Sequence, residues 1–187
     1  MILTESRLRQ AAQAARDQRV YTALGESLTA YNAAIKYDLF ISHSFSDKDL
    51  VIGLYHLFNT AGYKVYIDWI DDSSLDRKNV TPSTAQLIKN RIDNSTGTAY
   101  ISTSNSTSSK WCPWELGMAD GMKGRVCILP VMDSDFKGQE YLGLYPYLEY
   151  AQVAGKEKYE FWVYDQNDRK KYIVLNSWLH GNQPCYH

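Results

Sequence analysis

Glu115 is the residue of this chain whose setting best suits chemistry. It ends the run Trp111-Cys112-Pro113-Trp114-Glu115, at the expected start of a helix that follows an expected strand. In an open α/β sheet, ligands bind at such positions. An indole face can hold a planar ring, and a carboxylate can grip ribose hydroxyls or support a developing cation. The same position also suits a solvated first-turn glutamate stabilised by the helix dipole, with the indoles in the core.

A second run of interest extends from Tyr37 to Ser44, ends in Phe-Ile-Ser-His-Ser, and is followed by Ser46-Asp47-Lys48-Asp49. The next expected strand carries Gly-x-x-Val-x-x-Asp and ends at Asp68. In this order, and together with the Trp-Cys-x-x-Glu run, the pattern resembles the bacterial TIR domains that consume NAD. The resemblance covers roughly residues 37–179 and is closest in kind to the TIR component of a Thoeris-type antiphage defence system.

This resemblance implies an enzyme that cleaves the nicotinamide–ribose bond of NAD. NAD is then the substrate, and neither a prosthetic group nor a metal ion is expected. In the family the glutamate of this run engages the ribose and is required for cleavage, which assigns that role to Glu115. The departing nicotinamide is already cationic in NAD, so the barrier lies in forming an oxocarbenium-like ribose, which one carboxylate can stabilise. The ADP-ribose would be cyclised or transferred to give a nucleotide signal for a separate effector protein.

The resemblance also implies a set of NAD-binding residues. Trp111 matches an aromatic that packs against the nucleotide, His43 occupies a position where a ring lies against nicotinamide, and Asp68 matches an acidic residue near the ligand. With a flavodoxin-like strand order, the carboxyl ends of the strands bring three more residues to the same edge. These are Ser42, Ser44 and Trp69.

Simpler interpretations stay open for several of these side chains. Trp111 also suits the core, His43 a neutral strand-end histidine, and Asp68 a capping residue. Trp114 is expected in the core, because it shares a helical stripe with two methionines. Cys112 is not expected to be a nucleophile, since no general base is evident near it in the sequence.

The scaffold that positions these residues begins at Tyr37, where strand and helix patterns start to alternate. This predicts a flavodoxin-like, three-layer α/β fold of the TIR type with a central, mostly parallel five-stranded sheet. Strands are expected at residues 37–42, 63–68, 98–102, 125–131 and 159–164. Helices are expected from Ser46, with Asp49 completing a capping box, from Thr81 and Pro82, from Pro113, and over residues 171–180. Residues 133–158 are expected to be irregular.

Residues 1–36 differ from the TIR domain of residues 37–187 and form an expected N-terminal helical extension. Leu3, Leu8, Ala12 and Ala15 lie near helical spacing, and Thr4 is a candidate N-cap. Such a helix either packs on the flank of the domain or acts as an oligomerisation arm.

The segment from Trp69 to Val80 is long and polar for a strand-to-helix connection. It matches the loop that packs against a neighbouring subunit in TIR assemblies. The resemblance therefore implies a homo-oligomer whose site is completed across subunits.

Composition excludes several kinds of partner. A formal net charge of −1 offers no basic field, so neither a nucleic acid nor an acidic membrane surface is an expected partner. Three cysteines at no metal-ligand spacing suit a reduced cytoplasm. No apolar stretch approaches the roughly 18 residues of a membrane span, and charged residues occupy the N-terminus, so a cytoplasmic protein is expected.

Two other classes of function remain alternatives to the NAD-cleaving enzyme. One is a non-catalytic TIR interaction module, and the other is a nucleoside deoxyribosyltransferase-like enzyme with a related fold and a key carboxylate. Only the NAD-cleaving enzyme releases nicotinamide when it is incubated with NAD.

Overall fold

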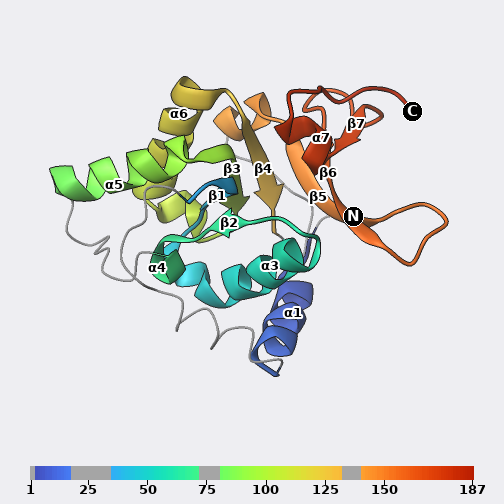
Figure 1. The fold of residues 1–187 in the computed structure, drawn as a ribbon, viewed down its shortest axis with the longest axis horizontal. Helices are drawn as coiled ribbons and strands as arrows, with labels where there is room; N and C mark the ends of the chain where they lie inside the picture. The colour runs from blue at the N-terminus through green and yellow to red at the C-terminus, as the bar shows by residue number, and fades with distance from the viewer. Residues whose placement is uncertain (1–2, 18–34, 72–80, 132–139) are drawn as a thin grey trace.

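The computed structural model describes residues 3–17, 35–71, 81–131 and 140–187. In this part of the chain, a seven-stranded sheet in the order β2-β1-β3-β4-β5-β6-β7 is flanked by helices (Figure 1). The strands are β1 Tyr37–Ser42, β2 Val65–Tyr66, β3 Ser95–Ser102, β4 Val126–Pro130, β5 Tyr147–Gln152, β6 Tyr159–Tyr164 and β7 Tyr172–Val174. The helices are α1 Glu5–Asp17, α3 Lys48–Thr60, α4 Asp68–Asp71, α5 Pro82–Asp93, α6 Trp111–Lys123 and α7 Leu175–Leu179, with 3₁₀ turns at Phe45–Asp47, Ser106–Ser108 and Glu140–Leu144.

The expected α/β fold with a mostly parallel sheet is confirmed, but the expected number of five strands was wrong. Strands β2, β1, β3, β4 and β5 are parallel, and β6 and β7 continue the sheet antiparallel. Strand β5 lies in the stretch that was expected to be irregular. A charged residue, Glu149, stands at its centre, and this glutamate can be buried there, at 2% exposed, because it pairs with Arg169. Strand β7 and the short α7 replace the helix expected over residues 171–180. The aromatic residues of this segment lie near helical spacing, so the pattern indicated a helix where Tyr-Ile-Val forms a strand.

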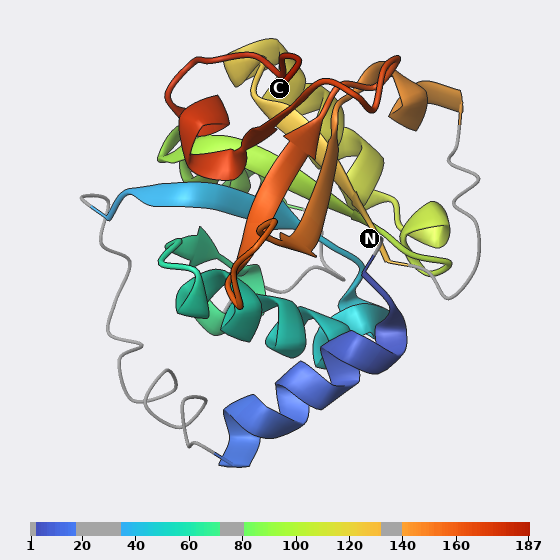
Figure 2. The ribbon, with the colours of Figure 1, turned by 90° about the vertical axis from the view of Figure 1, so that its right-hand side faces the viewer.

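Two hydrophobic cores make the molecule three-layered (Figure 2). Alternate side chains of each strand point to opposite faces of the sheet. On β1, Leu39 and Ile41 pack with α3, whereas Phe40 packs with α5 and α6. The helices that follow β1 and β3 therefore lie on opposite faces, and both begin at the carboxyl edge of the sheet.

Helix α1 packs along α3 on the outside of the domain, as both views show (Figures 1 and 2). Thr4 caps it as expected, since the Arg7 amide donates to Thr4 Oγ1 at 3.3 Å. The contact is close: a Cβ at Gly53 of α3 would lie 2.0 Å from the Leu8 carbonyl oxygen. Flank packing is thus the arrangement of residues 3–17, while the boundary at residue 36 stays a prediction.

The helix starts show which local signals were reliable. Thr81 caps α5 by accepting from the Thr84 amide, as expected, and Pro82 is its first residue. The capping box expected from Ser46 and Asp49 was wrong. Ser44 instead caps a 3₁₀ turn that precedes α3. Asp47 occupies the N-cap position of α3, but its side chain forms no capping hydrogen bond there.

Tyr63 makes the free energy of unfolding depend on pH in the alkaline range. Burial, reinforced by Glu160, raises the pKa of Tyr63 from 10.0 to about 12. The folded chain holds this proton more tightly than the unfolded chain, so the stabilisation is complete below pH 10 and is lost as the pH rises toward 12. We expect Tyr63→Phe to make the free energy of unfolding fall less steeply between pH 10 and 12, as measured by urea titration. Equal slopes for the two proteins would contradict this assignment.

Candidate active site

The carboxyl edge of the parallel strands holds most of the residues expected at the site, in two groups on opposite faces of the sheet. In the sheet register Ser42 at the end of β1 pairs with Tyr100 of β3, and Ser102 at the end of β3 pairs with Pro130 of β4. Chain segments far apart in sequence thus end side by side, where α6 begins.

Glu115 and Ser42 form the central pair of this edge. The Ser42 hydroxyl donates to Glu115 Oε2 at 2.6 Å, and both side chains are 0% exposed. A short hydrogen bond from a neutral donor orients a carboxylate without neutralising its charge. The interpretation of Glu115 as a solvated first-turn residue is therefore wrong.

His43 turns to the other face of the sheet, where it meets the start of α4. The Trp69 indole N–H donates to His43 Nε2 at 3.0 Å, and the other ring nitrogen, Nδ1, lies 2.9 Å from the Ile41 carbonyl oxygen. Because an indole nitrogen can only donate, Nε2 accepts this hydrogen bond, which leaves Nδ1 to donate to the carbonyl. Asp68 Oδ1 lies 3.4 Å from Nε2 and completes the group.

Three further side chains near the site have clear structural positions. Ser44 caps the 3₁₀ turn, so its hydroxyl is used in the fold. Trp111 is half-buried against the core beneath α6, with its ring 5.4 Å from the ring of Trp114. Its contact with a nucleotide stays a prediction. The expectation that Trp114 lies in the core was wrong, because it is 42% exposed.

The buried face of α6 explains why the stripe of Trp114 and the methionines was misread. Cys112, Leu116 and Ala119 pack inward at helical spacing, so Trp114 and Met122 are exposed and Met118 is only partly buried. Cys112 is enclosed in this core and is not placed to act as a nucleophile. Burial also raises the pKa of Tyr100, next to Ser42, so this phenol stays protonated and supplies no phenolate base.

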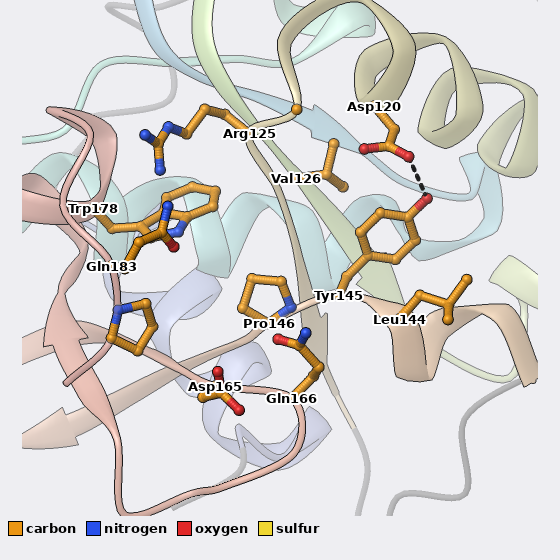
Figure 3. Close-up of a pocket in the computed structure, with 12 residues that line it drawn as sticks. Asp120, Arg125, Val126, Leu144, Tyr145, Pro146, Asp165, Gln166, Trp178 and Gln183 are labelled. Carbon is orange, nitrogen blue, oxygen red and sulfur yellow. Dashed lines mark hydrogen bonds between the residues drawn. The ribbon is translucent and has the colours of Figure 1, made fainter. Parts of the chain in front are cut away.

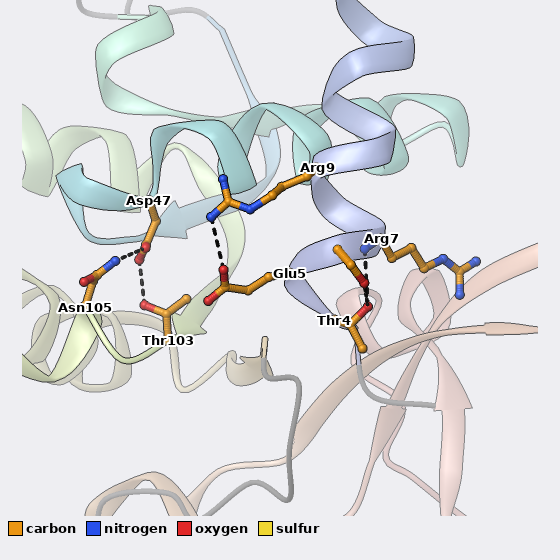
Figure 4. Close-up of polar contacts among 8 residues, drawn as sticks. Thr4, Glu5, Arg7, Arg9, Asp47, Thr103 and Asn105 are labelled. Atoms are coloured by element: carbon orange, nitrogen blue, oxygen red, sulfur yellow. Dashed lines mark hydrogen bonds and ion pairs between the residues drawn. The ribbon is translucent and has the colours of Figure 1, made fainter.

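A buried aspartate that the sequence analysis missed ties two loops of the site together (Figure 4). Asp47 Oδ2 accepts from the Thr103 hydroxyl and Asp47 Oδ1 from the Asn105 amide, both at 2.6 Å. These bonds join the start of α3 to the loop that leads from β3 toward α6. The Ser-Asp-Lys-Asp run indicated a structural role for an aspartate, but the aspartate with that role is Asp47 and not the expected Asp49.

One pocket of the described structure lies near this carboxyl edge of the sheet, and another lies at the opposite edge. One, of about 450 Å³, lies beside Asp47 and its partners Thr103 and Asn105, which we call the Asp47 cluster. This pocket is lined by residues of α1, the 3₁₀ turn, α3 and Asn105. The other, of about 370 Å³, lies around Arg125 and Pro146, where Tyr145 donates to Asp120 (Figure 3). It is at the amino ends of β4 and β5, and no expected site residue lines it.

Comparison with known families identifies this arrangement of strands, edge carboxylate and helices. Residues 39–167 match the family model described as the TIR domain. The chain belongs to the TIR domain family. The match contains Ser42, His43, Asp68 and Glu115, whereas α1 lies outside it.

The TIR chain is also similar to individual proteins. It is 37% identical over 170 residues to a protein described as a probable 3′ cyclic ADP-D-ribose synthase, ThsB′, from Bacillus cereus (strain MSX-D12), covering 89% of this chain and 87% of that protein. It is 37% identical over 81 residues to TIR2 of Cytobacillus dafuensis, named as a proposed cyclic ADP-D-ribose synthase, covering 43% of this chain but 21% of that protein. A crystal structure of the TIR domain of the Toll-related receptor TRR-2 from Hydra magnipapillata matches with a TM-score of 0.47 and 22% identity, covering 60% of this chain and 82% of that one.

The described part of this TIR protein contains neither a metal-binding cluster nor a membrane-spanning helix. No group of three or more His, Cys, Asp or Glu side chains is placed to hold a metal ion there. Among the helices of the same part, none combines the length and the apolar character needed to cross a bilayer.

Proposed function

We propose that this protein cleaves the nicotinamide–ribose bond of NAD and converts the ADP-ribose into a cyclic nucleotide signal in bacterial antiphage defence. The observation that carries the proposal is the buried Glu115 carboxylate, oriented by Ser42 at the carboxyl edge of a TIR sheet. The similarity over most of the chain to a protein described as a cyclic ADP-D-ribose synthase supports the same reaction here.

Glu115 acts on the ribose in this mechanism. The bond between ribose C1′ and the nicotinamide nitrogen breaks, and its electron pair stays on nicotinamide, which leaves as a neutral ring. The positive charge then lies on the ribose, where a preorganised carboxylate stabilises it. Ser42 holds that carboxylate in place. A hydroxyl or ring nitrogen of the same molecule forms the new bond to C1′ and closes the ring, and one proton is released to solvent.

The neighbouring side chains bind NAD and limit the access of water. His43 and Trp69 supply rings, with Asp68 beside them, and Ser44 and Trp111 complete the NAD-binding set that we propose. In the structure Glu115 and His43 are 0% and 1% exposed, so NAD reaches the carboxylate only after covering groups move. A site that opens for NAD and closes over the ribosyl cation favours capture by a positioned nucleophile over capture by bulk water.

The product decides between a signalling enzyme and a plain hydrolase. We expect chromatography and mass spectrometry of a reaction with NAD to show nicotinamide and a cyclic ADP-ribose, with linear ADP-ribose as the lesser species. Equal amounts of nicotinamide and linear ADP-ribose, with no other product, would exclude the signalling reaction. No release of nicotinamide at all would favour an interaction module or a deoxyribosyltransferase-like enzyme.

We also propose that the working form is a cytoplasmic homo-oligomer and that a separate effector protein receives the product. The loop expected to reach a neighbouring subunit runs from Trp69 to Val80, and its residues 72–80 lie outside the described residues. A site completed between subunits predicts that nicotinamide release rises more steeply than linearly with protein concentration. Strict proportionality between rate and concentration would favour a self-contained monomer.

A further inference from the structure

The pocket of about 450 Å³ beside the Asp47 cluster joins the N-terminal helix to the TIR domain. Its volume falls in the range of small-molecule sites, about 300 to 1,000 Å³. Phe45 and Ser46 line it directly after Ser44, so it adjoins the edge that holds Glu115. Its far wall is formed by Glu5 and Arg9 of α1, which point toward the Asp47 cluster (Figure 4).

The acidic residues of this pocket are each engaged by a partner. Asp47 is 2% exposed and accepts hydrogen bonds from Thr103 and Asn105. Asp49 accepts from the Arg16 guanidinium at 2.7 Å. The carboxylates therefore do not make the pocket a cation site.

Lys48 is a cation that lines the pocket, and its described contacts are with aromatic rings. Its ammonium group lies 4.0 Å from the ring centre of Phe45 and 5.2 Å from that of Trp69. Within the residues that the structure describes, it forms no ion pair with a carboxylate. Trp69 also donates to His43, so this ammonium lies between the pocket and the expected nicotinamide end of the site.

Arg9 is a second cation that can turn to a ligand at small cost. It pairs with Glu5 one helical turn away at 3.1 Å, and the two side chains are 57% and 35% exposed. Exposed pairs of this kind contribute little, because solvent screens them and two long side chains must be ordered. A phosphate group in the pocket would therefore compete readily for the guanidinium, which binds phosphate in a bidentate manner.

We propose that this pocket binds the adenosine diphosphate half of NAD, with Arg9 and Lys48 contacting the diphosphate; the inference rests on the proposed function. Phe45, which is 55% exposed, lines the same pocket beside Lys48, and its ring suits the purine. The diphosphate then spans from the α1 wall toward Trp69, which leaves the nicotinamide ribose at Glu115. Helix α1 thereby supplies a substrate-binding residue from outside the segment that matches the TIR family.

Direct binding to the full chain tests this site without relying on catalysis. We expect isothermal titration with ADP to show binding by the wild type and about tenfold weaker binding by Arg9→Gln, because a charge-assisted contact to phosphate is lost. Adenosine, which has no phosphate, should bind both proteins equally. Arg7→Gln is the matched control, since Arg7 points away from the pocket toward Tyr150 and Tyr159 and should not change ADP affinity.

Glu5→Gln gives a result of the opposite sign. Removing this carboxylate releases Arg9 and reduces repulsion of the phosphate, so ADP affinity should rise by up to about fivefold. No ADP binding by the wild type, unchanged affinity in folded Arg9→Gln, or equal losses in Arg9→Gln and Arg7→Gln would each overturn the inference. Failure of the wild type to release nicotinamide from NAD would instead count against the proposed function, and the ADP result would stand separately.

Discussion

Glu115→Gln should reduce the rate of nicotinamide release about 100- to 1,000-fold while leaving the fold intact. The substitution is nearly isosteric, and the Gln oxygen can still accept the hydrogen bond that Ser42 donates. What it removes is the negative charge that stabilises the ribosyl cation. Because the wild-type carboxylate is fully buried, replacing it with a neutral amide should leave the thermal unfolding midpoint unchanged or higher.

Glu149 provides the matched control for this experiment. It is also a buried glutamate, 2% exposed, but it lies on β5 and pairs with Arg169 away from the Ser42 edge. Glu149→Gln should keep normal turnover even if the loss of its ion pair lowers stability. Near-normal nicotinamide release by a folded Glu115→Gln protein would mean that another residue carries the chemistry.

The approach of Ser42 to Glu115 could be predicted because it depends on topology rather than on detail. Strands read as parallel must end at one edge of the sheet, and the helix after the third strand must start there. This argument needs neither rotamers nor exact strand lengths. The error in strand number does not affect it, since the two strands that were not expected, β5 and β7, lie at the side of the sheet away from β1.

The burial of Glu115 and the partners of His43 and Asp47 could not be predicted in the same way. Each depends on the direction in which a side chain leaves the backbone. Asp47 and Asp49 are two residues apart at the start of one helix, yet one is buried and holds Thr103, whereas the other is exposed and holds Arg16. Composition and spacing treat the two as equivalent, and only tertiary packing separates them.

Packing of the N-terminal helix on the flank of the domain was one of two expectations, but the sequence did not indicate that α3 is its partner. A glycine inside a helix usually costs stability, so replacing it with alanine stabilises by about 1 kcal/mol when there is room. At Gly53 there is none, since a Cβ would lie 2.0 Å from the Leu8 carbonyl oxygen. Gly53→Ala should therefore lower the free energy of unfolding by about 1 to 3 kcal/mol, the typical cost of overpacking, as measured by urea titration.

Gly121→Ala is the control of opposite sign. Gly121 lies inside α6, and nothing is within 4 Å of the Cβ that alanine would add, so the same substitution should raise stability. A Gly53→Ala protein as stable as the wild type would mean that α1 does not hold its position against α3.

If Gly53→Ala is destabilised as expected, the fraction of this variant that stays folded should also bind ADP more weakly, because moving α1 takes Arg9 away from the pocket. Binding of ADP that stays at the wild-type level while α1 is displaced would place the diphosphate elsewhere on the TIR domain.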